Sequence, residues 1–324
     1  MQICGKKSHA RIRSGLQSLP ALLSLRFSAC LRGLCVENRF LPFFVSFVGF
    51  CKVCGYPSPS VLFTVLSFGG ASTGCFSAVC LVCLSLTAFG QDNYEIQVYA
   101  SETVPAGRTM VELHSNYTID GQRERVNGVS PSDHAFHETL EITHGFTPWF
   151  ETGFYVFSSV QPGQGWEWVG DHIRPRVRIP AEWQWPIGLS LSTEFGFQRR
   201  SFSEDTWNWE LRPIIDKQWG RWYLALNPSF EKSIHGLNSA SGFDFAPSAK
   251  ISFDITRLVA VGVEYYSALG PVGRFDNWEN QQHQIFPTLD LIFSPDWEFN
   301  LGIGIGLTRS TDDLMVKLIL GRRF

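Results

Sequence analysis

Most of the chain lacks cysteine. All eight cysteines lie before residue 84, so the remaining 324 − 83 = 241 residues have none. A disulfide framework, which an even number of cysteines in an exported chain can indicate, is therefore excluded after residue 83. Cys51 and Cys54 have CxxC spacing, but they lack the second pair or the βαβ context that a metal or redox site needs. The sequence implies no metal ion and no other cofactor.

Acidic residues are nearly absent from the N-terminal part of the chain. Residues 1–90 contain eight Lys/Arg and a single acid, Glu37. Because the whole chain has 27 basic and 30 acidic residues, 27 − 8 = 19 basic and 30 − 1 = 29 acidic residues remain in 91–324, a net charge of −10. This acidic balance argues against a nucleic-acid partner.

The stretch 61–89 carries no charge and is long enough to span a membrane. It ends in small residues around Ala88 and Gly90 and is followed at once by polar residues, which is typical of a signal-peptidase site. We expect cleavage near Gly90/Gln91, with a retained membrane anchor as the alternative. A presequence of 90 residues is abnormally long, so we also expect the true translation start to lie after Lys52.

From Thr109 onward, apolar residues alternate with polar or small ones over stretches of about ten, separated by turn residues. This period of two is the pattern of half-buried strands, and ten residues is the length a tilted strand needs to cross a bilayer. The pattern predicts twelve strands, at residues 109–119, 133–143, 150–160, 171–180, 187–198, 206–216, 221–231, 242–253, 258–267, 283–293, 297–308 and 313–323.

An even strand number allows an antiparallel sheet to close, so the fold class predicted is all-β: an antiparallel transmembrane β-barrel of about 12 strands. Residues 91–108 then form a lead-in segment. We expect this segment in the periplasm; parity excludes it from the barrel wall but also allows a place against the lumen. A soluble β-sandwich or lipocalin-like barrel is the rival architecture.

Two features favour the membrane barrel over its rival. Short connections mostly alternate with longer ones, as periplasmic turns alternate with outer loops in outer-membrane barrels. The 11 tryptophans fall near strand ends, where their amphipathic rings suit a membrane–water interface. The predicted location is the bacterial outer membrane, with its lipids as partners.

The C-terminal strand resembles the targeting strand of outer-membrane proteins, which ends in an aromatic residue and repeats apolar residues at alternate positions before it. The matching residues are Phe324, Leu320, Leu318, Val316 and Leu314. Arg322 departs from the pattern, since that position is usually apolar or aromatic. This resemblance implies recognition by the barrel-assembly machinery.

A narrower resemblance rests on residues 141–154, which contain His144-Gly145-Phe146-Thr147-Pro148-Trp149. This stretch looks like the strand–turn–strand of outer-membrane transporters grouped with a meta-pathway phenol-degradation family. The resemblance implies passage of small molecules, which could be aromatic.

Strand alternation predicts which charged side chains face the lumen. One strand directs a basic column inward, and its neighbours direct mainly acidic residues inward; the set comprises His172, Arg174, Arg176, Arg178, Glu151, Glu194, Glu210, Arg212 and Asp216. Charged groups at membrane depth must face water or one another, and rings of charge set selectivity in pores. The alternative is that these charges cross-link the strands and plug a narrow lumen. Some aromatic residues also point inward, where they could stack on a solute or fill space: Tyr155, Phe157, Tyr223, Tyr266 and Phe286.

Signals for enzymatic chemistry are lacking. His137 and Glu138 begin like a zinc-protease motif, but Glu141 stands where the second histidine belongs and the context is a strand. There is no serine elbow for a hydrolase, although a triad assembled from separate strands stays open.

We therefore expect a passive channel for small solutes rather than an enzyme. The alternatives are a plugged structural or adhesive barrel that acts through outer loops such as 161–170 and 268–282, and an outer-membrane hydrolase.

Overall fold

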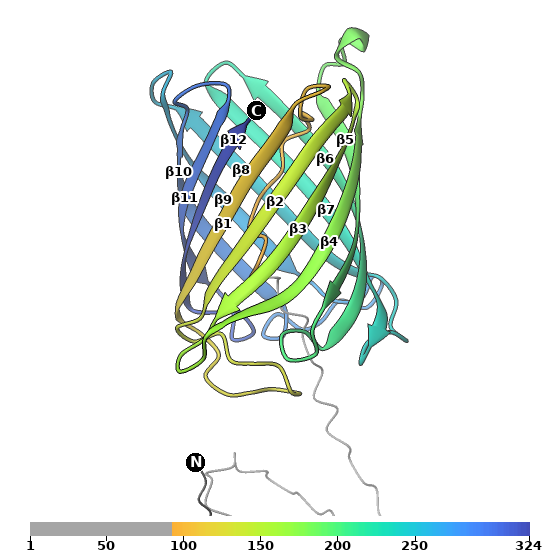
Figure 1. The fold of residues 1–324 in the computed structure, drawn as a ribbon, viewed down its shortest axis with the longest axis vertical. Coiled ribbons are helices and arrows are strands. Elements are labelled where there is room, and N and C mark those ends of the chain that lie inside the picture. The colour runs from red at the N-terminus through yellow and green to blue at the C-terminus, as the bar shows by residue number, and fades with distance from the viewer. Residues whose placement is uncertain (1–92) are drawn as a thin grey trace, which may run out of the picture. The chain divides into compact units, whose positions relative to one another are not determined.

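A computed structural model describes residues 93–324. The uncharged stretch 61–89, the expected cleavage site and the expected late start all lie outside these residues. The described chain forms a barrel of twelve antiparallel strands with one short 3-10 helix, η1 (Ala181–Trp183), in a periplasmic turn (Figure 1). Among residues 93–324, no helix is long and apolar enough to cross a membrane.

Every strand that the alternation predicts is present. The strands are β1 (Thr109–Asp120), β2 (Phe136–Thr147), β3 (Phe150–Val160), β4 (Trp166–Arg178), β5 (Gly188–Gln198), β6 (Asp205–Trp219), β7 (Trp222–Gly236), β8 (Asp244–Asp254), β9 (Val259–Ala268), β10 (Gln282–Leu291), β11 (Trp297–Gly306) and β12 (Leu314–Arg323). The largest differences from prediction are at outer ends: β4 begins five residues earlier and β7 ends five residues later. There the strands extend beyond the apolar belt, so alternation of apolar residues no longer marks them.

The sheet closes because β1 pairs with β12 as well as with β2. Leu113 lies opposite Leu320 on β12, and backbone hydrogen bonds join Thr109 and Phe324 in both directions, at 3.2 and 2.8 Å. Closure leaves no unpaired strand edge, which is the condition for a sheet to lie in lipid.

Burial is reversed compared with a water-soluble protein. Outward-facing apolar side chains such as Ile173, Leu191 and Ile303 are 43–51% exposed, while inward polar residues such as Thr139 and Ser192 are fully buried. Ten of the eleven tryptophans are exposed. An apolar exterior with aromatic residues toward both rims is the surface of an outer-membrane barrel, and it rules out the soluble alternatives.

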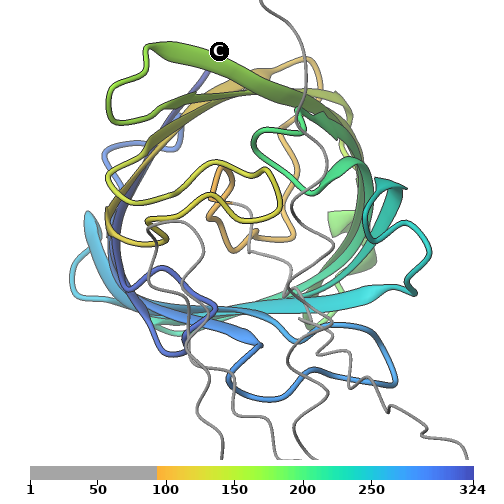
Figure 2. The same ribbon diagram turned by 90° about the horizontal axis from the view of Figure 1, so that it is seen from below.

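The segment before β1 lies inside the barrel, as Figure 2 shows in orange. It begins at the outer end, where Nδ2 of Asn93 donates to Asp312 at 2.9 Å, and it leaves at the periplasmic end, where the Gly107 amide donates to Gly145 at 2.7 Å. The periplasmic position expected for this segment is therefore wrong, and the lumenal alternative is what the structure shows. We call residues 93–104 the lumenal segment.

The composition of the lumenal segment explains its position. Ile96 and Val98 are buried in an apolar cluster with Tyr266, Phe286 and other wall residues, which spares their surfaces from water. Its backbone pairs with no strand, but side chains of the wall supply hydrogen-bond partners at several positions. A polar lumen can therefore hold an unpaired segment that the bilayer could not.

Candidate functional site

The outer half of the lumen holds a cavity of about 420 Å³. We call it the vestibule. Arg212 is the only Lys or Arg among the described residues that line it, whereas nine lining residues are acidic: Glu95, Glu124, Glu194, Glu204, Asp205, Glu210, Glu231, Asp244 and Asp312. Acidic side chains therefore predominate among the charged residues of the vestibule wall.

The connection between β1 and β2 partly covers the mouth of the vestibule, visible in yellow in Figure 2. The amide of Ser130 donates to the carbonyl oxygen of Ser201 at 2.8 Å, and Nδ2 of Asn127 donates to Glu204 at 2.6 Å. Both partners lie in the connection between β5 and β6, so this loop reaches across the lumen. This contact narrows the opening of the vestibule.

Arg212 is engaged on the vestibule wall. It contacts Glu210 at 2.7 Å and Glu95 of the lumenal segment at 3.3 Å, and it donates from Nε to Ser229 at 3.1 Å. His172 and Glu194 form a second close pair on the neighbouring strands. Arg212, the only Lys or Arg among the described residues of the vestibule wall, is thus already paired with two carboxylates.

The periplasmic half of the lumen is filled around Tyr99. Its amide donates to Oδ1 of Asn227 at 2.7 Å, and Nδ2 of Asn227 donates back to the Tyr99 carbonyl at 3.0 Å. One asparagine side chain thus satisfies both backbone groups of a segment that has no strand partner. Tyr99 is 5% exposed and its hydroxyl lies 3.1 Å from that of Tyr155, which is fully buried.

Two members of the predicted basic column lie in this filled half. Arg174 pairs with Glu141 at 2.6 Å, and Arg176 pairs with Glu151 at 2.6 Å. The Arg174 guanidinium also lies 4.5 Å from the centre of the Tyr99 ring. Arg174 and Arg176 are 2% and 6% exposed, so in this conformation they cross-link the wall and do not line an open pore.

The end of the lumenal segment is held by the same network. Nη1 and Nη2 of Arg176 donate to the carbonyl oxygens of Ala100 and Glu102 at 3.1 and 2.7 Å. The amide and hydroxyl of Ser101 donate to Asp216 at 2.9 and 2.6 Å. The Val104 amide donates to Glu151 at 2.5 Å. Charged groups of the wall thus bind the backbone that closes the lumen.

The structure separates the predicted lumenal set into two groups. His172, Glu194, Glu210 and Arg212 line the vestibule. Glu151, Arg174, Arg176 and Asp216 surround residues 99–104. Arg178 stands apart at the periplasmic end of β4, half-buried, where it donates to the carbonyl oxygen of Ile179 at 3.4 Å. A selectivity role for any of them stays a prediction.

The inward aromatic residues also divide between the two halves. Tyr155, Phe157 and Phe286 are fully buried and fill space. The hydroxyl of Tyr223 donates to Asp216 at 2.9 Å. Tyr266 lines the vestibule and lies in the apolar cluster that holds the lumenal segment.

A second buried charge cluster was missed by the sequence analysis. Lys317 pairs with Glu264 and donates to the carbonyl oxygen of Ile96 at 2.9 Å, while Lys250 bridges Glu264 and Asp290 at 3.1 and 2.9 Å. The resemblance to a targeting strand rests on the apolar, outward face of β12, which does not include Lys317. Its inward position follows from the same alternation, because its neighbours Val316 and Leu318 face outward.

No known protein family matches the chain by sequence, and no curated protein matches it. Among solved structures, the chain is similar to an outer-membrane channel from Pseudomonas putida F1, with 12% identity, a TM-score of 0.48, and coverage of 71% of this chain and all of the other. It is also similar to the KdgM porin (11% identity, TM-score 0.42, covering 66% of this chain and 99% of the other) and the NanC porin (9%, 0.42, covering 65% and 97%).

Proposed function

We propose that this protein is an outer-membrane channel for small solutes, cationic ones above all, whose periplasmic half opens when the lumenal segment shifts. The observation that carries the proposal is the vestibule, an open acidic cavity inside a closed barrel. Fixed carboxylates in a confined space concentrate cations and repel anions, so they set selectivity as charged rings do in other pores.

The walls of the vestibule also favour partly aromatic solutes. Tyr94, Phe202, Trp209 and Tyr266 line it together with the carboxylates. An aromatic face attracts a cation through its ring quadrupole and packs against an apolar ring. A small organic cation is therefore the solute class that this surface fits best.

Passage requires the lumenal segment to move, because four of its residues are buried in the path: Tyr99, Ser101, Thr103 and Val104. The lumenal segment is held largely by separate hydrogen bonds and ion pairs from side chains of the barrel wall. It is not part of a continuous ladder of backbone hydrogen bonds. Separate contacts can be exchanged one after another, whereas a paired strand must be removed from the sheet as a unit. A shift of this segment therefore leaves the barrel wall intact.

The filled periplasmic half also supports a second candidate, a closed scaffold that acts through its outer loops. Single-channel recording of the protein in a planar bilayer under a salt gradient distinguishes the two. The channel should show discrete openings with a reversal potential on the cation-selective side. A folded barrel that never conducts would favour the scaffold, and anion-selective openings would contradict the role given to the vestibule.

A further inference from the structure

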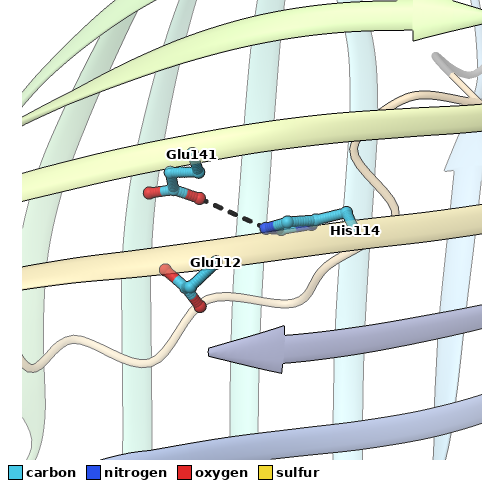
Figure 3. A group of neighbouring side chains, drawn as sticks. All are labelled: Glu112, His114 and Glu141. Carbon is cyan, nitrogen blue, oxygen red and sulfur yellow. Dashed lines mark ion pairs between the residues drawn. The ribbon is translucent and has the colours of Figure 1, made fainter. Parts of the chain in front are cut away.

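Three buried ligand-type side chains converge on β1 and β2, apart from the vestibule (Figure 3). They are Glu112 and His114 of β1 and Glu141 of β2, and one oxygen or nitrogen from each lies within 4.8 Å of those of the others. Glu112 and His114 share one strand face because they are two residues apart, and the register places Glu112 directly opposite Glu141. The three are 6%, 0% and 0% exposed.

The negative charges of Glu112 and Glu141 are not compensated equally by nearby cations. Like charges directly opposite each other destabilise a strand pair, so this arrangement needs a compensating cation. Arg174 supplies one to Glu141, contacting Oε1 at 2.6 Å. Among the described residues, no Lys or Arg lies within ion-pair distance of Glu112.

A second acid increases the imbalance. Glu298 of β11 is the other close neighbour of Glu112. Gly321 of β12 pairs with both residues, and a Cβ there would lie 2.8 Å from Cγ of Glu112 and 3.2 Å from Cβ of Glu298. Because Gly321 has no side chain, Glu112 and Glu298 can approach each other over it. Glu298 receives a hydrogen bond from Gln97 at 3.1 Å but has no ion pair within the described chain.

Several polar atoms at this point have no hydrogen-bond partner in the described chain. They are Oε1 of Glu112, Oε2 of Glu141 and both ring nitrogens of His114. The contact that exists, between Nε2 of His114 and Oε2 of Glu141, is 3.4 Å long. Buried polar atoms without partners are costly, at about 1–3 kcal/mol each. A bound ion would satisfy three of these four atoms: Oε1 of Glu112, Oε2 of Glu141 and Nε2 of His114.

We propose that Glu112, His114 and Glu141 bind one divalent transition-metal ion of the zinc class. The ligand atoms are an oxygen of Glu112, Nε2 of His114 and Oε2 of Glu141, since Oε1 of Glu141 is engaged by Arg174 and Thr143. A mixed nitrogen and carboxylate set suits zinc, with water in the fourth position. Ligands about 2.1 Å from a tetrahedral ion lie about 3.4 Å apart, the separation of the His114 and Glu141 atoms.

The test uses tag-free, EDTA-treated full-length protein purified from membranes, with Co²⁺ as the probe. A tetrahedral Co²⁺ site produces visible absorption bands, which should saturate at one equivalent and disappear when Zn²⁺ is added. His114→Ala and Glu112→Gln should each weaken Co²⁺ binding by more than about tenfold. Substitution of residues that merely hydrogen-bond to metal ligands already lowers metal affinity by about 10-fold to 100-fold. Glu112→Gln keeps the side-chain volume, so it still tests the site if the His114→Ala variant does not fold.

His137→Ala is the matched control. His137 is also a buried lumenal histidine, on the adjacent strand, and it is 4% exposed. This variant should keep the one-equivalent bands. The proposal is overturned if the wild type shows no stoichiometric band, which would mean that a proton balances these acids. It is equally overturned if the band survives both His114→Ala and Glu112→Gln.

Discussion

The outer and periplasmic halves of the lumen use the same kinds of side chain in opposite ways. In the vestibule, nine acidic residues surround an open cavity with Arg212 as the only Lys or Arg among the described residues lining it. In the periplasmic half, Arg174 and Arg176 are buried, paired with carboxylates and in contact with Tyr99 or with the backbone of residues 100–102. We propose that the charges bordering the cavity select the solute, whereas the buried and paired charges of the periplasmic half hold the structure together.

This difference shows that an inward charge is not by itself a selectivity element. An eight-stranded barrel has an interior filled by side chains, and a sixteen-stranded barrel has an open aqueous channel. The lumen of a twelve-stranded barrel is intermediate in width. One additional segment is then enough to close half of it. The position of residues 93–104 therefore decides which lumenal charges border the open cavity.

The largest effect is expected from Arg174→Met. The change removes the cation that pairs with Glu141 and contacts Glu151 at 3.8 Å, leaving buried carboxylates without it. Breaking a buried pair by removing one partner costs about 3–5 kcal/mol, and we expect this loss in the free energy of unfolding measured by tryptophan fluorescence in denaturant. Arg178→Met, on the same strand face but half-buried, should cost less than about 1 kcal/mol. Equal losses in the two variants would contradict the division of the basic column.

Asn227→Ala should have a smaller effect on stability and a clear one on conduction. The change leaves the buried amide and carbonyl of Tyr99 without their partner, a cost of about 1–3 kcal/mol that falls on the closed state. Open probability in a planar bilayer should therefore rise about tenfold. Ser233→Ala is the control and should leave gating unchanged, because Ser233 lies on the same face of β7 and its hydroxyl makes no hydrogen bond within the described residues. A gating change as large in the control would show that Asn227 does not anchor the segment.

The smallest effect is expected from the double change Glu231→Gln and Asp244→Asn in the vestibule. These acids are register partners on β7 and β8. Neutralising them should shift the reversal potential toward zero. Each charge contributes up to about 1 kcal/mol, so the cation preference should fall by up to about fivefold for each charge removed. Stability should rise by less than about 1 kcal/mol because like charges no longer face each other. Glu182→Gln, in a periplasmic turn, should change neither quantity, and an unchanged reversal potential in the double variant would contradict a selective vestibule.

The sequence predicted the wall of the barrel well because each strand carries its own signal. Alternation along a strand reports which side chains face lipid, and it needs no information from other strands. The strand count, the closed sheet and the inward direction of Arg174 and Arg176 all follow from it.

The place of residues 93–104 could not be predicted in the same way. Parity excludes these residues from the wall, but a segment without strand partners has no periodic relation to its surroundings. Its position is set by single contacts such as Tyr99 with Asn227, which are 128 residues apart in the chain. The pairing of Glu112 with Glu141 depends likewise on cross-strand register, which alternation within one strand does not report.

The most direct test concerns residues 99–104, which fill the periplasmic half of the lumen and, on our proposal, must move for conduction. Ser101 Oγ and Asp216 Oδ1 lie 2.6 Å apart, and no native cysteine follows residue 83, so Ser101→Cys with Asp216→Cys places one new cysteine pair in the lumen. Single-channel current should be absent while this pair is oxidised and should return on reduction with dithiothreitol, whereas each single variant should conduct in both states. The same current before and after reduction of a confirmed disulfide would contradict the account.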